Sequence, residues 1–258
     1  MPFTLSHTVL APALARLSGQ RLPVAALAIG CMTPDLYRLF TEENYNFSHQ
    51  WHSLYSLNLA MGLFFCLLWY LLYRPALYRF LSLNDPIQIR SWLTALRFVL
   101  MLCLAIMLGA ATHLIWDGLT HSDFRTFAFE DFLNREVSLL QQQYPMHRVL
   151  QIGSSIAVLP VLIWMCCRYY SKHHHPATQT CRVIIYAASL ALISFFSACF
   201  VYVHQAQQFD PLLRQTDLYT FLGRSMNVFS TAFLICFSLG CLLFLILDRF
   251  GGFRRDQA

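Results

Sequence analysis

Charged side chains are scarce in this sequence. Aspartate, glutamate, lysine and arginine make up 12% of its 258 residues, whereas apolar residues make up 57%. An ordinary soluble domain has about 25% charged residues, many of which cover its surface. The shortage therefore excludes a typical soluble protein and indicates a chain whose surroundings are themselves apolar, as in a lipid bilayer.

Three further features are missing. The 18 basic residues, all arginine except Lys172, lie between apolar runs rather than in one patch, which argues against a nucleic-acid partner. The nine cysteines form no C-x-x-C pair, so we interpret them as small apolar packing residues. The N-terminus lacks the basic region of a signal peptide, so we expect insertion to begin with the first spanning helix.

Long apolar runs are the main feature that is present. Five of them reach the length of about 20 residues that a helix needs to cross the hydrocarbon core of a bilayer. They cover approximately residues 54–73, 96–116, 149–170, 182–203 and 226–247. A helix satisfies its own backbone hydrogen bonds in lipid, so the sequence predicts an all-α, polytopic membrane helical bundle.

The segment 8–33 has a different pattern. Two apolar stretches, each too short to span, lie on either side of a polar turn at 18–23. We predict a helical hairpin, which would bring His7 close to Asp35. A single spanning helix over 8–32 is the alternative, and it would place two arginines in the membrane core and separate these two residues.

The chain is predicted to form a single integral membrane domain, residues 1–258, because it contains no repeat and no low-complexity stretch. With five spans, the loops 74–97 and 168–182 and the C-terminal tail share one side of the membrane. That side holds ten of the 18 basic residues. Basic residues concentrate on the cytoplasmic side, so the excess favours a cytoplasmic C-terminus and an outer, periplasmic N-terminal side.

The N-terminal side is rich in histidine and also contains aspartate. Histidine nitrogens and carboxylate oxygens form a usual ligand set for a divalent metal ion such as zinc or manganese. The residues concerned are His7, His49, His52, His113, His121, His147, His204, Asp35, Asp117 and Asp123.

The strongest motif is His-Leu-Ile-Trp-Asp-Gly-Leu-Thr-His at residues 113–121, at the end of the second predicted span. Residues four apart share a helix face, so His113 and Asp117 can point at one atom, and His121 lies one turn further along. Ionisable groups at the end of a membrane helix are unusual, so we interpret them as candidate functional residues. The alternative is an interfacial His and Asp that solvate or cap the helix end.

Two other segments add candidate ligands. In Thr-Pro-Asp at residues 33–35, the proline is expected to end a helix and to hold Asp35 on a rigid turn. In the segment 48–53, His49 and His52 are three residues apart and are expected to face the same way. Alone, Asp35 is better explained as an ordinary loop residue, and the two histidines are equally well explained as head-group residues. Only the combination of the segments predicts a site.

Several motifs together resemble an uncharacterised bacterial multi-pass membrane family, one of the families of domains of unknown function. They are Met-Pro-Phe-Thr-Leu-Ser-His at 1–7, Gly-Cys-Met-Thr-Pro-Asp at 30–35, His-Ser-Leu at 52–54, the stretch 109–121, and Gln-Ile-Gly-Ser-Ser at 151–155. The resemblance covers the first 155 residues, and the rest of the chain follows it only by hydropathy.

The order His, Pro-Asp, His-Ser and His-x-x-x-Asp is also similar, more distantly, to the YdjM/YbcI type of inner-membrane metal-dependent hydrolases. This resemblance implies a bacterial inner membrane and a metal-binding role for His7, Asp35, His52, His113 and Asp117. The hydrolase type usually reads Pro-Asp-x-Asp, whereas Tyr37 stands here at the second acidic position, and Trp51 stands where that type has threonine. The missing carboxylate puts a two-metal site in doubt.

Together, the residues and the resemblance predict that this protein is a membrane-embedded metal-dependent hydrolase. It would act on an ester or phosphoester at the membrane interface. A divalent ion would lower the pKa of a bound water toward neutrality. His49 or His121 would act as general base or acid, and a lipid or lipid-linked substrate suits the head-group depth. The alternative is a non-enzymatic membrane protein, either a scaffold or a small transporter, although the uncharged middle of each span argues against transport.

Overall fold

Five helices of the computed structural model are long and apolar enough to cross a membrane. They are Trp51–Phe80, Trp92–Thr120, Met146–His173, Cys181–Ala206 and Thr220–Arg249. The structure describes residues 4–41, 43, 45–139, 141–175, 180–209 and 218–253. The five helices confirm the all-α polytopic class, and the protein is a multi-pass membrane protein.

The first spanning helix is assembled from short pieces. A 3₁₀-helix, η3 (Trp51–Tyr55), leads into α4 (Leu57–Leu68), which continues through a π-helical turn, η4 (Trp69–Tyr73), into α5 (Arg74–Phe80). A proline in the first turn of α5 has no amide proton to donate, which accounts for the irregular turn just before it. The predicted loop after residue 73 is therefore helical for another seven residues.

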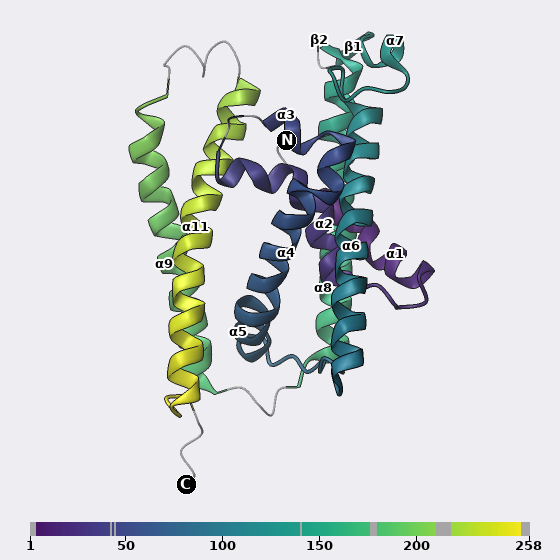
Figure 1. Cartoon of the computed structure of the whole chain (residues 1–258). Coiled ribbons are helices and arrows are strands. Elements are labelled where there is room, and N and C mark those ends of the chain that lie inside the picture. Colours follow the sequence, from purple (N-terminus) through teal and green to yellow (C-terminus); the bar gives the residue numbers. More distant parts are fainter. Residues whose placement is uncertain are drawn as a thin grey trace. The chain divides into compact units, whose positions relative to one another are not determined.

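The remaining long helices are regular. Ser91 and Thr94 form a capping box that starts α6 (Trp92–Thr120) four residues before the predicted span. The helices α8 (Met146–His173), α9 (Cys181–Ala206) and α11 (Leu218–Arg249) complete the set (Figure 1). Because α6 continues to Thr120, Asp117 lies inside its last turn rather than in a loop.

The N-terminal segment forms the predicted hairpin. A 3₁₀-helix, η1 (Thr4–Leu10), runs into α1 (Ala11–Leu17), and the chain reverses before α2 (Val24–Leu36). The reversal uses Gly19 and Gln20, both with a positive φ of 65° and 61°. The hairpin brings the start of η1 back to the end of α2, where Thr4 Oγ1 donates to Asp35 Oδ2 at 2.9 Å.

The prediction that Pro34 ends this helix is wrong. Pro34 lies inside α2, which continues to Leu36 and then into a short 3₁₀-helix, η2 (Tyr37–Leu39). Proline cannot donate to the carbonyl of Gly30, but Thr33 Oγ1 donates to that oxygen at 2.8 Å. The hydroxyl therefore replaces the missing hydrogen bond, and Asp35 lies on a helix instead of a turn.

Two glycines let α2 approach α6 closely (Figure 1). A Cβ atom on Gly30 would meet the backbone oxygen of Ile106, and one on Gly109 would lie 2.7 Å from the backbone nitrogen of Cys31. Small residues at a crossing allow membrane helices to pack backbone to backbone. This crossing holds the end of α2 against the last turns of α6.

The connection between α6 and α8 contains structure that the sequence did not predict. It holds a helical turn, α7 (Glu130–Leu133), and an antiparallel pair of strands, β1 (Glu136–Leu139) and β2 (Gln142–Pro145). In their register Glu136 pairs with Pro145 and Leu139 pairs with Gln142. One further short helix, α3 (Tyr45–Ser48), lies between η2 and the first span.

The chain divides into two compact units. The N-terminal unit falls within Phe3–Cys66 and Gln88–Cys167, and the C-terminal unit falls within Leu67–Ile87 and Arg168–Ala258. In the C-terminal unit, α9 and α11 pack along each other and α5 joins them (Figure 1). The organisation of residues 1–258 as a single domain stays a prediction.

Candidate metal site

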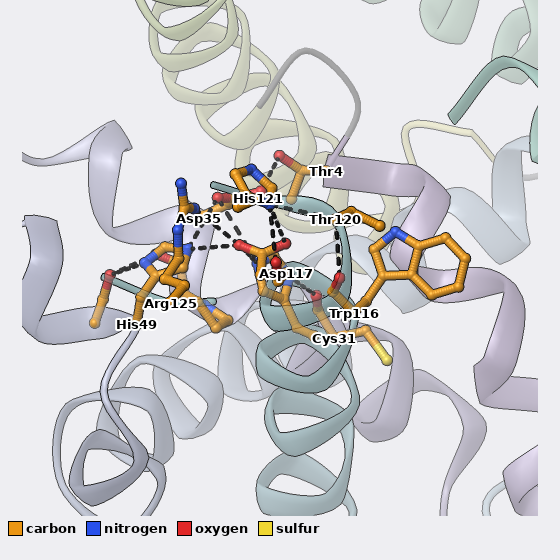
Figure 2. A network of polar contacts seen from close by, with 12 residues as sticks. Thr4, Cys31, Asp35, His49, Trp116, Asp117, Thr120, His121 and Arg125 are labelled. Carbon is orange, nitrogen blue, oxygen red and sulfur yellow. Dashed lines mark hydrogen bonds and ion pairs between the residues drawn. The ribbon is translucent and has the colours of Figure 1, made fainter. Parts of the chain in front are cut away.

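Six polar side chains gather in the N-terminal unit where α2 and α6 end (Figure 2). Asp35 comes from α2, His113 and Asp117 come from the last two turns of α6, and His121 is the residue that caps this helix. Figure 2 labels Asp35, His49, Asp117 and His121. His7 belongs to η1, and His49 follows α3 directly. All six side chains are buried. We call them the His/Asp cluster.

The ligand atoms of five cluster residues form two overlapping groups, each compact enough to hold one ion. One group consists of His7, Asp35 and His113, and a second consists of His49, His113 and Asp117; within each group the atoms lie within 4.8 Å of one another. Asp117 Oδ2 is 3.5 Å from both His49 Nε2 and His113 Nε2. His113 is common to both groups and is fully buried.

Backbone and hydroxyl contacts fix the two central rings. His113 Nδ1 donates to the backbone oxygen of Cys31 at 2.7 Å, which leaves Nε2, 3.5 Å from Asp117 Oδ2, as the ring nitrogen that would exchange its proton for a metal ion. Ser48 Oγ lies 2.9 Å from His49 Nδ1 and donates its proton to a backbone carbonyl, either that of Pro34 or that of Tyr45. The serine oxygen and the hydroxyl of Tyr45, which is 3.0 Å from Nε2, therefore hold the two ring nitrogens of His49 in place.

Asp35 is held as an ionised carboxylate. Thr4 Oγ1 contacts one of its oxygens at 2.9 Å, and the hydroxyl of Tyr45 contacts the other at 2.8 Å. Burial alone would raise the pKa of Asp35, but His113 and His49 beside it hold that pKa well below its ordinary value. Burial and the charge of Asp35 raise the pKa of Tyr45, so this hydroxyl keeps its proton and donates.

His7 and His49 are neutral at physiological pH. The ring of His7 stacks on that of His113 with 4.0 Å between centroids. Burial and the neighbouring His113 lower the pKa of His7 to about 3, and burial also lowers the pKa of His49. Metal ions bind the unprotonated imidazole, so these rings need lose no proton on binding.

A partly buried arginine neutralises part of the cluster's charge. Arg125 Nη1 donates to Asp117 Oδ2 at 2.9 Å, and its Nε donates to Asp123 Oδ1 at 2.9 Å (Figure 2). The loop that carries Arg125 folds back onto α6, where the ring of Phe127 occupies the space that a side chain on Gly118 would need. The arginine is therefore positioned by packing as well as by charge.

The donor set fits a divalent cation. Within the described part of the chain, His113 Nε2 and Asp117 Oδ1 are buried side-chain atoms that make no hydrogen bond. Leaving such a group unsatisfied costs about 1–3 kcal/mol, and a cation among the imidazoles and carboxylates would satisfy both atoms. Nitrogen and carboxylate donors in this mixture suit zinc or manganese.

The structure places the predicted site residues unequally. His7, Asp35, His49, His113, Asp117 and His121 come together, whereas His52 lies outside the cluster, is exposed and packs against Phe47 with 4.7 Å between ring centroids. His49 and His52 do not face the same way because Gln50 is extended, with φ −96° and ψ 149°, and breaks the helix between them. Of these two histidines, the structure brings His49 to the position for which the resemblance implied His52.

Sequence reasoning missed two residues that contact the cluster directly. Tyr45 lies 2.8 Å from Asp35 Oδ1 and 3.0 Å from His49 Nε2, and Arg125 contacts Asp117. The spacing of Tyr45 and His49, four residues apart, was a usable signal because such residues meet on a helical turn. For Arg125 no local pattern existed, because a non-helical loop brings it back to α6.

Comparison with known families places the whole site in one family. A model of the family described as "Domain of unknown function (DUF4184)" matches residues 1–247. The chain belongs to the DUF4184 family. No curated protein and no solved structure matches this DUF4184 chain. The family match includes every residue of the His/Asp cluster, and it confirms the resemblance to an uncharacterised family.

The DUF4184 site is tied to α8 by two polar contacts. Gln151 Nε2 donates to the backbone oxygen of Thr120 at 2.9 Å, and Ser6 Oγ lies 3.5 Å from Ser155 Oγ. These contacts link the third spanning helix both to the end of α6 and to η1, next to His7. Small polar residues at the start of α8 therefore serve helix packing around the cluster.

Proposed function

We propose that this DUF4184 protein is a membrane-embedded metal-dependent hydrolase that acts on an ester or phosphoester at the membrane interface. The observation that carries the proposal is the convergence of His49, His113 and Asp117, whose ligand atoms lie within 4.8 Å of one another in a buried setting. His113 Nε2 faces both carboxylates, at 3.5 Å from Asp117 Oδ2 and 3.9 Å from Asp35 Oδ1, but makes no hydrogen bond among the described residues, which is the spacing that an ion between these groups would use.

The metal ligands in this proposal are His49, His113 and Asp117, with His7 and Asp35 on the other side of His113. A divalent ion in such a site supplies a Lewis acid and lowers the pKa of a bound water. The chain's own residues orient the donors: Cys31 and Ser48 hold the rings, and Tyr45 holds the carboxylate of Asp35. Fixed donor orientation of this kind raises metal affinity by about 10–100-fold.

His121 is the proposed general base. Thr120 Oγ1 and the Asp117 carbonyl lie 3.3 and 3.2 Å from its Nδ1, which leaves Nε2 as the ring nitrogen for a reacting proton. Burial lowers the pKa of His121 to about 4, so at physiological pH the ring is neutral, which is the form that a general base requires. Arg125, whose Nη1 donates to Asp117 Oδ2 at 2.9 Å, would stabilise negative charge that develops on an ester or phosphoester oxygen at the cluster.

The proposed location is a bacterial inner membrane, with the cluster on the outer, periplasmic side. The excess of basic residues on the opposite side supports this orientation. The cluster lies at the end of the spanning helix α6, so its substrate is a molecule that reaches head-group depth.

A matched pair of histidine variants tests the metal site. We expect purified protein loaded with zinc or manganese to hold about one ion per chain. His49→Ala should lose the ion, because His49 contributes a buried nitrogen, whereas His52→Ala should keep it, because His52 is exposed and outside the cluster. Metal content is measured by plasma mass spectrometry after removal of free ions.

The same samples test the activity. Metal-loaded wild type and His52→Ala should hydrolyse p-nitrophenyl esters or phosphoesters, and His49→Ala should not. Equal metal content in both histidine variants would reject the metal site formed by His49, His113 and Asp117. A stable wild-type protein that binds no metal would reject the hydrolase and favour a scaffold.

A further inference from the structure

A cleft lies beside the His/Asp cluster and has a volume of about 50 Å³. Its walls come from three elements: Val9 and Leu10 from η1, Trp116 from α6 and Val158 from α8, with His7 among the lining residues. Apart from His7, a few hydroxyls such as that of Ser154 provide its polar lining. The cleft is therefore shaped mainly by hydrocarbon and aromatic groups.

The cleft opens between two membrane-spanning helices. Two of its own lining residues, Leu10 on η1 and Trp116 on α6, are 42% and 40% exposed, and Ile156, close by on α8, is 54% exposed. In a multi-pass membrane protein these large apolar side chains face lipid. Trp116 lies about 6 Å along the helix axis from Thr120, at the end of α6, which is the depth at which tryptophan lines the membrane interface. The cleft is thus continuous with the lipid-facing surface.

His7 connects the cleft to the cluster. Its ring lines the cleft, and it stacks on His113 with 4.0 Å between centroids. Figure 2 shows the indole of Trp116 projecting away from Asp117, so the two residues lie on different sides of the same helical turn. A molecule in the cleft would therefore have one end against His7 and the other in the bilayer.

We infer that the cleft holds a hydrocarbon chain of a lipid substrate, which enters sideways from the bilayer and presents its ester or phosphoester group to the His/Asp cluster. This inference rests on the proposed hydrolase and narrows its substrate class to lipids. The apolar lining matches a hydrocarbon chain, because a chain that moves in from the bilayer exchanges lipid contacts for van der Waals contacts with the lining and exposes no apolar surface to water. A small water-soluble ester would make few favourable contacts with this lining. It would also not partition into the bilayer, from which the cleft is entered.

Photocrosslinking tests the inference independently of catalysis. The probe is phosphatidylethanolamine with a diazirine in one acyl chain, mixed into phosphatidylethanolamine/phosphatidylglycerol vesicles that contain the full-length protein. After illumination, adducts are mapped by mass spectrometry. We expect adducts on residues 6–9 of η1, where Ser6 and His7 are buried against the cleft and face away from bulk lipid.

Filling the cleft should remove these adducts. Ser154→Trp and Val158→Trp place a large ring in the cleft, and each should lower labelling of residues 6–9 by about tenfold, which corresponds to about 1.4 kcal/mol of lost binding. Ile156→Trp is the matched control, because Ile156 lies on the same helix but faces lipid outside the cleft. Its labelling should equal that of wild type.

The possible outcomes separate this inference from the proposed function. Absence of adducts on residues 6–9 in wild type, or equal labelling in the filling and control variants, overturns the lipid cleft. Metal content of each sample is measured in parallel. A protein that binds metal but shows no cleft labelling leaves the metal site intact and refutes only the lipid substrate, whereas cleft labelling without metal retains the lipid site and refutes the hydrolase.

Discussion

The two units of this DUF4184 protein are both built from apolar helices, but one has a polar, ionisable interior and the other has an apolar interior. In the N-terminal unit, the space between α2 and α6 ends in buried imidazoles and carboxylates. In the C-terminal unit, the core consists of rings and aliphatic groups, with Phe80 and Phe244 at 4.5 Å between centroids. Its ion pair, Arg79 with Asp248, is 28% exposed on both side chains.

This contrast indicates where the protein carries function. A purely structural membrane bundle has no need to bury several ionisable groups, because an apolar core packs at lower cost. The C-terminal unit follows that rule and the N-terminal unit does not. The buried charges of the N-terminal unit are therefore the feature that a function must explain.

Glycine substitutions should separate the two units most strongly. Gly109→Ala places a methyl group against the backbone of α2, which cannot move aside, so we expect a loss of about 3 kcal/mol in stability and a loss of metal binding. Gly240→Ala, in α11, meets only the flexible side chain of Leu190 and should cost less than about 1 kcal/mol. Unfolding in a denaturing-detergent titration measures both, and equal losses would contradict the close backbone crossing.

Removing one carboxylate from each unit should give a smaller difference. Asp117→Asn removes a fully buried carboxylate and deprives Arg125 of one of its two carboxylate partners, so we expect about 2 kcal/mol lower stability and loss of the bound metal ion. Asp248→Asn breaks a partly exposed pair and should cost less than about 1 kcal/mol. The same titration checks both variants, and a larger effect at Asp248 would reverse the assignment of the buried charges.

A hydroxyl behind the site should have the smallest effect. Ser48→Ala removes the oxygen that orients His49 and should weaken metal affinity by about tenfold, with the fold retained. Ser238→Ala is the control in the C-terminal unit, where the serine contacts Tyr73 instead of a cluster residue. Competition with a chelator measures the affinities. Unchanged affinity in Ser48→Ala would show that the ring of His49 needs no such support.

The sequence was a good guide to the spanning helices and to part of the site. Each span is a local run of apolar residues, so its position follows from composition, and the His113–Asp117 pair follows from helical spacing. The end of α2 was predicted wrongly, because a side-chain hydrogen bond from Thr33 carries the helix through Pro34. The sequence also could not show which of His49 and His52 joins the cluster, because that depends on the extended backbone of Gln50.

By itself the sequence determined that the chain enters a membrane, how many helices cross it, and that histidine and aspartate gather toward one side. Only the tertiary structure decided that these side chains share one buried pocket and that Arg125 and Tyr45 belong beside them. Hydropathy and helical spacing act over a few neighbouring residues and can be read from a linear pattern. Convergence depends on how closely α2 and α6 cross at Gly30 and Gly109, which is a property of packing between distant segments.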